Sequence, residues 1–535
     1  MAVTKFSIGE LERFALQRFR RERLVELIER LGFPVEGFEE GCVLADITPN
    51  RIDAASPEGL GRALASLTGK KTGMRDYTTK PSGLSLTIHP SVLSVRPFIV
   101  AAVARLPLGE AGLLSLIGLQ EKIHDTFGRR RRKASIGIHD LDKTKPPFAY
   151  RALAGDAISF LPLDSAREMT PAQVLTEHPK GREYGHILER KKLLPLVLDA
   201  QGPISFPPII NAERTRVTEK TTNLFIEATG TSPEAVSEAL NIICCALAER
   251  GAAIESVRCG KKLTPQLKPT KRTLSLATVN SVLGTSLTAA RGASLLARMG
   301  FGAKPRGKSL EVLVPPYRTD ILHEIDFVED IAIALGYDSP ELSPRLPGLL
   351  TIGRSAQSPL EETARRTLIG LGFLETISST LSSHRTNFDL LLLPHGPACE
   401  LLNPLTEDYS LLRTHLLPSL LLVFQSAKSE KAPQRIFELG PVFDAQGGEH
   451  ARLAAAELDA AAGYARLRAA ADALFAELGW EVAYKPAAHQ TFIPGRVAKI
   501  LLGKRELGFI GELHPQVLNN FGLEQPVAAF EIALA

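Results

Sequence analysis

Two proline-rich stretches interrupt the chain and limit what it can fold into. The first is KKLTPQLKPTKRT, residues 261–273, and the second is PELSPRLPGLLTIGRSAQSP, residues 340–359. Proline cannot continue a helix or the interior of a sheet, so both stretches indicate connectors between domains. One hydrophobic core seldom serves more than about 250–300 residues, and this chain has 535. We therefore expect a multi-domain α+β protein in which each module packs its own helices and strands.

The composition is that of an ordinary globular protein. It is 44% hydrophobic and 23% charged, with a net charge of +4. No apolar run reaches the roughly 18 residues that a membrane span needs, and the N-terminus lacks a signal-peptide core. The five cysteines form no C-x-x-C pair, which argues against a disulfide framework and against a zinc site. We expect a soluble cytoplasmic protein with no membrane contact.

Acidic residues gather in YRTDILHEIDFVEDIAIALGYD, residues 317–338. An apolar stripe at helical spacing predicts a helix that a glycine ends, with Asp320 as its N-cap; the stripe comprises Ile321, Ile325, Val328, Ala332 and Leu335. Asp326 and Asp330 lie four residues apart with Glu329 beside them, and such like charges repel by roughly 0.2–0.5 kcal/mol per pair. Two interpretations remain open: a solvated acidic face, or a site for a hard cation such as Mg²⁺.

Basic residues gather in two places. RRRRK, Arg129–Lys133, follows a helical pattern, and a second group lies near the start on a predicted helix: Arg18, Arg20, Arg21 and Arg23. Such runs neutralise phosphates in nucleic-acid-binding proteins, and they also occur as solvated surfaces. The sequence leaves the role of Arg129–Lys133 open.

The common catalytic motifs are absent from the sequence. GKKTGM, Gly69–Met74, has the wrong order for a phosphate-binding loop, and no G-x-G-x-x-G follows a predicted strand. Neither G-x-S-x-G nor H-E-x-x-H occurs. Physical reasoning on the residues alone therefore ends at a cytosolic protein with a candidate carboxylate site for a cation.

Four separated stretches carry a resemblance to a known family. They are DITPNRIDAASPEGLGRAL, FPPIINAERTRVTEKTTNLFIEATGT, PPYRTDILHEIDFVEDIAIALGYD, and LLNPLTEDYSLLRTHLLPSLL with the later RIFELGPVFD. In this order and spacing they resemble the β subunit of phenylalanyl-tRNA synthetase of the archaeal and eukaryotic-like type. The resemblance extends over nearly the whole chain, because HPKGREYGHIL at 178–188 and IGELHPQVLNNFGLEQPVAAFEI near the end also agree with it.

The resemblance implies an α2β2 ligase that attaches phenylalanine to tRNA(Phe) at the expense of ATP, with the synthetic site in the α subunit. It implies four modules: an N-terminal α/β module at 1–88, a mixed α/β tRNA-editing module at 89–265, a small, helix-rich, winged-helix-like module that binds Mg²⁺ at 270–342, and an antiparallel class II synthetase fold at 355–535. RIFELGPVF, Arg435–Phe443, resembles a degenerate second motif of that class. We therefore expect the last module to contact α and not to catalyse aminoacylation.

The resemblance also implies a second activity, hydrolysis of tyrosine mischarged on tRNA(Phe). A phenylalanine pocket excludes tyrosine only by one hydroxyl, so errors are removed at a second site that hydrogen-bonds that hydroxyl. The candidate pocket residues are Pro208, Asn211, Thr215, Glu227 and Thr229. The alternatives are that Glu227 is a strand residue facing solvent, and that the chain is a non-catalytic tRNA-binding and assembly subunit or a paralogue that lacks editing.

For the acidic segment, the resemblance implies a magnesium site associated with the α subunit. Its implied ligands are Asp320, Asp326, Glu329 and Asp330. His323 and Glu324 are expected to be exposed neighbours of this site.

Overall fold

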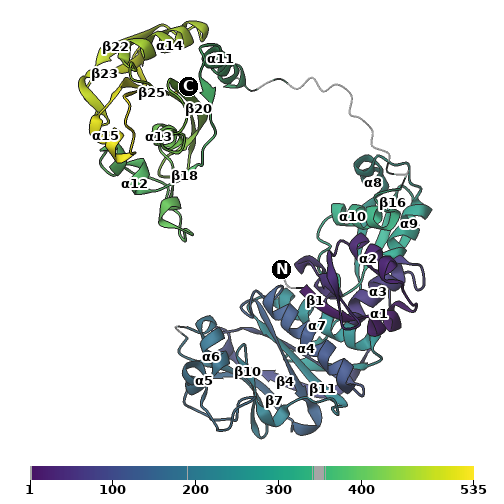
Figure 1. Ribbon diagram of the computed structural model, residues 1–535. Helices are drawn as coiled ribbons and strands as arrows, with labels where there is room; N and C mark the ends of the chain where they lie inside the picture. Colours follow the sequence, from purple (N-terminus) through teal and green to yellow (C-terminus); the bar gives the residue numbers. More distant parts are fainter. Residues whose placement is uncertain are drawn as a thin grey trace. The chain divides into compact units, whose positions relative to one another are not determined.

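The computed structural model describes residues 3–189, 191–339, 342, 353, 355 and 357–534, which form two compact units, Met1–Leu346 and Pro347–Ala535 (Figure 1). Both units combine helices with sheets, so the expected multi-domain α+β architecture is confirmed. The predicted connector 340–359 lies largely outside the described residues. Among the helices that the structure describes, none is both long and apolar enough to cross a membrane.

The first unit begins with a three-stranded antiparallel sheet of order β1-β3-β2 and three helices. Their bounds are β1 Val3–Ser7, α1 Ile8–Ala15, α2 Arg21–Arg30, β2 Val35–Glu39, β3 Cys42–Asp46 and α3 Pro57–Leu67. Helix α3 begins where the sequence predicts, because the Ser56 hydroxyl accepts the Gly59 N–H and proline occupies the first helical position. Arg18 and Arg20 precede α2, so the prediction that the whole basic group lies on a helix is wrong.

A ten-stranded mixed sheet forms the largest part of the first unit. Its order is β10-β9-β8-β7-β4-β12-β5-β11-β6, with β13 on β12; β4 runs parallel to β7 and β12, and the remaining pairs are antiparallel. The strands are β4 Thr79–Ile88, β5 Phe98–Arg105, β6 Ala134–Asp140, β7 Phe148–Leu153, β8 Leu194–Asp199, β9 Gly202–Phe206, β10 Ile210–Asn211, β11 Asn223–Gly230, β12 Ala253–Cys259 and β13 Lys262–Thr264.

Four helices accompany this sheet: α4 Gly109–Asp125, α5 Pro171–Glu177, α6 Pro179–Tyr184 and α7 Pro233–Glu249. Helices α4 and α7 pack on β5, β6 and β11, while α5 and α6 lie near β10 (Figure 1). The sheet also curls, since β10 and β6, at opposite ends of the strand order, contact each other. The Asn211 side-chain amide of β10 donates to the Ile138 carbonyl of β6 at 3.2 Å. This curl encloses the cavity described below.

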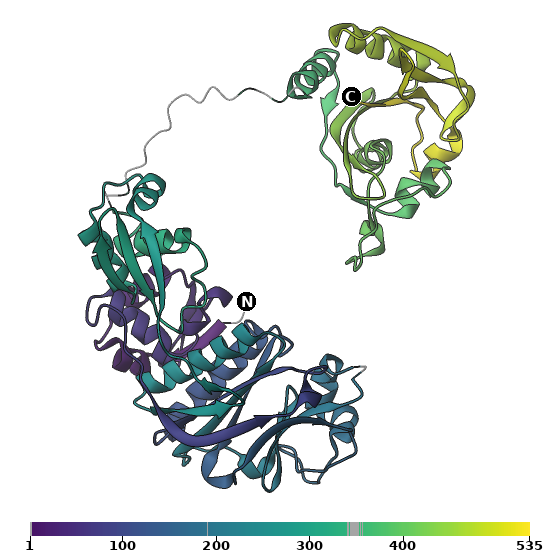
Figure 2. The same ribbon diagram turned by 180° about the vertical axis from the view of Figure 1, so that it is seen from behind.

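A third sheet, of order β14-β16-β15, completes the first unit with helices α8, α9 and α10 (Figure 2). The bounds are β14 Thr270–Ser275, α8 Leu276–Leu283, α9 Ala289–Arg298, β15 Gly302–Arg306, β16 Ser309–Val314 and α10 Glu324–Leu335. The stretch 261–273 is therefore not a free connector, because β13 and most of β14 form within it. One continuous apolar core joins this module to the N-terminal module and to α4 and α7, which makes the first unit compact.

Helix α10 is shorter than the acidic segment predicts. It begins at Glu324, after His323 as N-cap, and ends where Gly336 adopts φ +91°. Asp320 is therefore not its cap, and Ile325 of the predicted apolar stripe is 51% exposed. His323 and Glu324 are exposed, as predicted.

The second unit is a seven-stranded sheet of order β17-β20-β21-β25-β24-β23-β22, antiparallel except for β17 on β20. Its strands are β17 Leu374–Glu375, β20 Gln434–Phe443, β21 Glu449–Leu458, β22 Val482–Pro486, β23 Phe492–Leu502, β24 Arg505–Leu513 and β25 Val527–Ala533, and β18 Leu381–Ser382 pairs with β19 Leu411–Leu412. Its helices are α11 Gln357–Gly370, α12 His384–Asn387, α13 Leu417–Ser426, α14 Tyr464–Glu477 and α15 Pro515–Asn520. Helix α14 packs on one side of the sheet, and α13 and α15 belong to a separate core.

Candidate functional site

A cavity of about 790 Å³ opens where the large sheet curls. Its walls come from α4, from β6, β9, β10 and β11, from the segments 163–169 and 215–217, and from the α5–α6 junction. Most of the lining is apolar, with a few convergent polar groups from the strands. A concave, apolar site with such groups is what recognition of a small, partly polar side chain requires.

Glu227 is the buried acid of this cavity. It lies on β11 opposite Gly137 of β6 and is 1% exposed. The Ser205 hydroxyl donates to its Oε1 at 3.0 Å, while Oε2 is buried without a hydrogen-bond partner. Burial raises the pKa of Glu227 to about 7, although Ser205 and Arg96 both oppose the rise. The carboxyl can therefore both donate and accept a hydrogen bond near neutral pH.

Gly137 leaves open the space in front of this carboxyl. A Cβ atom at position 137 would lie 2.3 Å from Glu227 Oε1 and 3.1 Å from His139 Nε2. His139 is fully buried, and burial lowers its pKa to about 3, so the imidazole is neutral. Its Nδ1 lies 2.9 Å from the Thr215 hydroxyl, which itself donates to the Ala212 carbonyl. The Nδ1 atom therefore carries the proton, and Nε2 is a buried acceptor without a partner.

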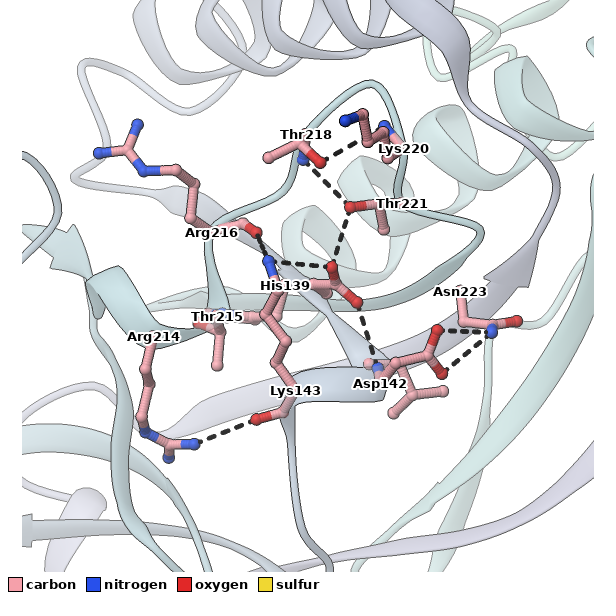
Figure 3. A network of polar contacts seen from close by, with 12 residues as sticks. His139, Asp142, Lys143, Arg214, Thr215, Arg216, Thr218, Lys220, Thr221 and Asn223 are labelled. Carbon is pink, nitrogen blue, oxygen red and sulfur yellow. Dashed lines mark hydrogen bonds and ion pairs between the residues drawn. The ribbon is translucent and has the colours of Figure 1, made fainter.

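The loop that carries Thr215 is clamped onto the turn after β6 (Figure 3). The Thr221 hydroxyl donates to Asp140, and Lys143 donates to the Arg216 carbonyl at 2.8 Å. Arg214 reaches back to the Lys143 carbonyl at 3.4 Å. These bonds connect the two ends of the loop to one turn, so Thr215 is held beside His139.

Thr229 lies two residues beyond Glu227 and serves a different contact. Its hydroxyl accepts from Nε of Arg96 at 3.0 Å and lies 3.1 Å from the Ser135 hydroxyl. Arg96 is 1% exposed, and burial lowers its pKa to about 10. Thr229 is therefore a partner of a buried arginine and not part of the cavity wall.

Four of the five residues that the sequence singles out line the cavity: Pro208, Asn211, Thr215 and Glu227. Thr229 does not. The alternative that Glu227 faces solvent is wrong, because its side chain is buried. Sequence reasoning missed Ser205 and His139, which contact Glu227 and Thr215. The only signal for Ser205 was its position just before the FPPIIN motif.

The acidic segment of the third module is organised around one arginine. Arg318 donates to both oxygens of Asp320, at 2.8 and 2.7 Å, and to Asp330 at 2.6 Å. Its guanidinium lies over the Phe301 ring, 4.7 Å from the centroid. All three charged side chains are buried or nearly so. Of the acids that the sequence expects to repel one another, Asp330 is thus paired with a guanidinium.

The other two predicted ligands lie apart from this pair. The Asp326 carboxylate accepts the Leu322 and His323 N–H groups at 2.7 Å each, which caps α10 from inside. Glu329 is exposed. Within the described residues, no group of three or more His, Cys, Asp or Glu is placed to hold a metal ion. The donor set does not fit Mg²⁺ in this arrangement, and the magnesium assignment stays a prediction without support from the geometry.

In the second unit, RIFELGPVF forms β20, and its acid is already paired. Arg413 donates to Glu438 Oε1 at 2.7 Å and to the Ser378 hydroxyl at 2.8 Å. The Arg413 and Glu438 side chains are each only 2% exposed. Arg435 instead pairs with Glu457 of β21. Arg435 and Glu438 of this stretch are thus each paired with a charged residue outside it.

Three segments of the chain match models of known protein families. The B3/4 domain matches residues 116–247, the tRNA synthetase B5 domain matches residues 272–337, and the phenylalanyl tRNA synthetase beta chain CLM domain matches residues 343–534. The cavity lies mainly in the first segment and the acidic cluster in the second. Together these models define a subunit of an aminoacyl-tRNA synthetase.

Relatives that match nearly the whole chain identify which aminoacyl-tRNA synthetase this subunit resembles. The chain is 39% identical over 518 residues to the phenylalanine–tRNA ligase beta subunit of Methanocorpusculum labreanum, covering 96% of this chain and 95% of the relative. It is 39% identical over 547 residues to that of Archaeoglobus fulgidus, covering 100% and 98%. A crystal structure of an N-terminal fragment of the Pyrococcus horikoshii phenylalanyl-tRNA synthetase beta subunit is 37% identical with a TM-score of 0.61, covering 63% of this chain and 100% of the fragment. The chain belongs to the family of phenylalanine–tRNA ligase β subunits.

Proposed function

We propose that the chain is the β subunit of an α2β2 phenylalanine–tRNA ligase, in which it supports ATP-dependent attachment of phenylalanine to tRNA(Phe) by an α subunit. Family membership carries this proposal, because the curated relatives cover nearly the whole chain. ATP and Mg²⁺ belong to the synthetic reaction of the complex. We place the enzyme in the cytoplasm, where translation consumes charged tRNA.

The chain's own activity in this proposal is hydrolysis of mischarged Tyr-tRNA(Phe), and the observation that carries it is the buried Glu227 with its unpaired oxygen. A tyrosine hydroxyl that reaches this carboxyl satisfies an atom that is otherwise without a partner. Phenylalanine would leave the same carboxyl unsatisfied, which costs about 1–3 kcal/mol for a buried polar group. The module at 89–265 therefore selects the residue that the synthetic site fails to exclude.

In this proposal the protein supplies no nucleophile for the hydrolytic step. None of the described cavity residues forms a nucleophile–base pair of the Ser–His or Cys–His kind. We assign attack on the ester to a positioned water, assisted by the ribose hydroxyl of the substrate. Pro208, Asn211 and Thr215 shape the pocket, Glu227 recognises the tyrosine hydroxyl, and Thr229 supports the strand through Arg96.

Deacylation by the assembled enzyme tests this proposal. Preformed Tyr-tRNA(Phe) and Phe-tRNA(Phe) are incubated with the wild type, with Glu227→Ala and with Glu234→Ala, an exposed glutamate on α7 as the matched control. We expect fast release of tyrosine, slow release of phenylalanine, and loss of the tyrosine preference only in Glu227→Ala. No release above background by the wild type would support the alternative of a non-catalytic assembly and tRNA-binding subunit.

For the module at 355–535 we propose an inactive class II synthetase fold that contacts the α subunit. The internal pairing of Arg413 with Glu438 supports the loss of catalysis. Large apolar side chains support the interface: Ile377 is 94% exposed, Leu402 103% and Leu405 100%. Leu402 and Leu405 lie in one exposed stretch, 401–409, and large exposed apolar patches mark association sites. Co-purification with a phenylalanine-specific α partner tests it, and a chain that stays alone would favour the paralogue alternative.

For the module at 270–342 we propose a winged-helix-like fold, because a small three-stranded sheet packs with three helices. We propose residues 1–88 as a distinct α/β module within the first compact unit. The magnesium ligands Asp320, Asp326, Glu329 and Asp330 remain a prediction for the complex, and the ion pairs of Arg318 argue against it.

A further inference from the structure

The basic run after α4 forms an unusual turn. Three consecutive residues, Arg129, Arg130 and Arg131, have φ values of +51°, +51° and +65°. The left-handed region is unfavourable for a non-glycine residue, so three in a row persist only where the surroundings impose them. The backbone is tied to the end of α4, because the Arg131 N–H donates to the His124 carbonyl at 3.0 Å.

A buried arginine side chain also holds this turn. Arg96 donates to the carbonyls of Arg132 at 3.2 Å and Arg131 at 3.1 Å, and it also donates to the Thr229 carbonyl at 2.7 Å. The same guanidinium therefore connects the turn to β11, two residues from Glu227. Arg96 and the backbone bonds to α4 together fix the position of the turn.

The turn divides its arginines between the cavity and the surface. Arg131 is buried and lines the cavity, where it donates to the Ile209 carbonyl at 3.0 Å and lies over the Tyr184 ring. Arg129, Arg130 and Arg132 are exposed. No ion pair links these three side chains to a carboxylate in the part of the chain that the structure describes.

Other cations of the cavity wall are neutralised. Arg167 pairs with Glu177, Lys180 with Glu183, and Arg216 with Glu213 and Asp164. Arg129, Arg130 and Arg132 flank Arg131 of the cavity wall along the chain and carry uncompensated positive charge; we call them the arginine rim. Of the basic run only Arg131 lines the cavity, and the rim residues are its neighbours along the chain. The basic group near the N-terminus has no such neighbour, because the cavity is lined by residues from 113 onward.

We propose that the arginine rim binds backbone phosphates of the single-stranded 3′ end of a charged tRNA and so delivers its aminoacyl ester to the cavity. The proposal rests on the proposed editing function for the identity of the RNA. Guanidinium groups suit phosphates because they make charge-assisted, bidentate bonds, and single strands are bound by such basic tracks. The rim thereby explains why the chain keeps a strained turn at this edge of the cavity.

The test compares two triple variants of the assembled enzyme. In the rim variant Arg129, Arg130 and Arg132 become alanine, which carries the same Cβ and so adds no backbone strain. In the control variant Arg18, Arg20 and Arg21 become alanine, which removes the same charge from the N-terminal group. The substrates are Tyr-tRNA(Phe) and a tyrosyl ester of adenosine, which has the reacting ester but no phosphate.

We expect the rim variant to raise KM for Tyr-tRNA(Phe) on the order of 10-fold, with kcat within twofold and hydrolysis of the adenosine ester unchanged. The slope of log KM against log salt should fall by about 2, because each phosphate contact on a single strand contributes about 0.7. Replacing the three arginines by lysine should restore most of the affinity. The control variant should match the wild type.

An unchanged KM and salt slope in the rim variant would overturn the proposal. It would also be overturned if hydrolysis of the adenosine ester fell as far as hydrolysis of the tRNA, because the turn would then only shape the cavity. If the wild type hydrolyses neither substrate, the editing function fails and the rim is judged by binding of an acceptor-stem minihelix. A salt slope lowered by about 2 in the rim variant would then support it, and equal slopes would reject it.

Discussion

Replacing Glu227 by glutamine keeps the shape of the buried side chain and removes its ability to titrate. Burial raises the pKa of this group from 4.5 to about 7 in the folded protein. The folded state therefore holds the proton at pH values where the unfolded chain has released it. Stability is fully present below pH 4.5, is lost as the pH rises from 4.5 to 7, and stays reduced above that. Glutamine has no such dependence.

The magnitude follows from the size of the pKa change. One pKa unit corresponds to about 1.4 kcal/mol, so the wild type should lose about 3 kcal/mol of unfolding free energy between pH 4.5 and 8 through this carboxyl. Unfolding entropy is about 2.1 cal/mol/K per residue, so a unit that spans Met1–Leu346 shifts by about 1.4 °C per kcal/mol. The melting temperature of the first unit should therefore fall by on the order of 4 °C more in the wild type than in Glu227→Gln. The carboxyl is 1% exposed, so solvent screens this effect little.

Differential scanning calorimetry of the full chain across this pH range measures the effect. The single tryptophan, Trp480, lies in the second unit, so its fluorescence should follow a transition that the substitution leaves unchanged. Glu234→Gln, on the exposed first turn of α7, is the control and should keep the wild-type pH slope. A Glu227→Gln protein with the full wild-type pH slope would refute the reasoning, since the carboxyl would then titrate normally.

Three further changes test the site, the acidic cluster and the interface. Gly137→Ala places a Cβ atom 2.3 Å from the Glu227 carboxyl, which must then shift. It should slow Tyr-tRNA(Phe) hydrolysis at least 10-fold in deacylation assays, and an unaffected rate would show that this space is not used. Arg318→Met leaves buried Asp330 without its cation and should cost about 3–5 kcal/mol, measured by calorimetry. Magnesium should neither rescue this variant nor raise the wild-type midpoint above that in EDTA, and a rise would restore the metal assignment. Leu402→Ser with Leu405→Ser should weaken α-subunit binding in size-exclusion chromatography without changing Trp480 fluorescence, whereas intact assembly would place the interface elsewhere.

Local signals in the sequence were reliable wherever one segment decides its own conformation. Ser56 and the following proline predict the start of α3, and the structure begins the helix there. The end of α10 at Gly336 was predicted for the same reason, because a glycine stops a helix through its own backbone. The start of α10 was not, since Asp320 is bonded to Arg318 and does not cap the helix.

The family and four of the five pocket residues could also be predicted from short motifs, because those residues cluster in two stretches of the chain. The partners of these residues could not. Ser205 meets Glu227 across 22 positions, and Arg96 meets Thr229 across 133. No periodicity or spacing rule reports such a distance, since it depends on how the sheet curls.

The charged clusters show most clearly the difference between what the sequence predicts and what the tertiary structure decides. The amino-acid order indicates that carboxylates or guanidiniums crowd together, and it therefore predicts that something must compensate them. In the folded chain Arg318 pairs with Asp320 and Asp330. The three arginines of the rim are exposed and have no carboxylate partner among the described residues. Helix propensity and capping act over one or two turns of the chain, so they can be predicted from the sequence. Burial and charge pairing depend on which distant segments share a core, so they can be known only from the three-dimensional packing.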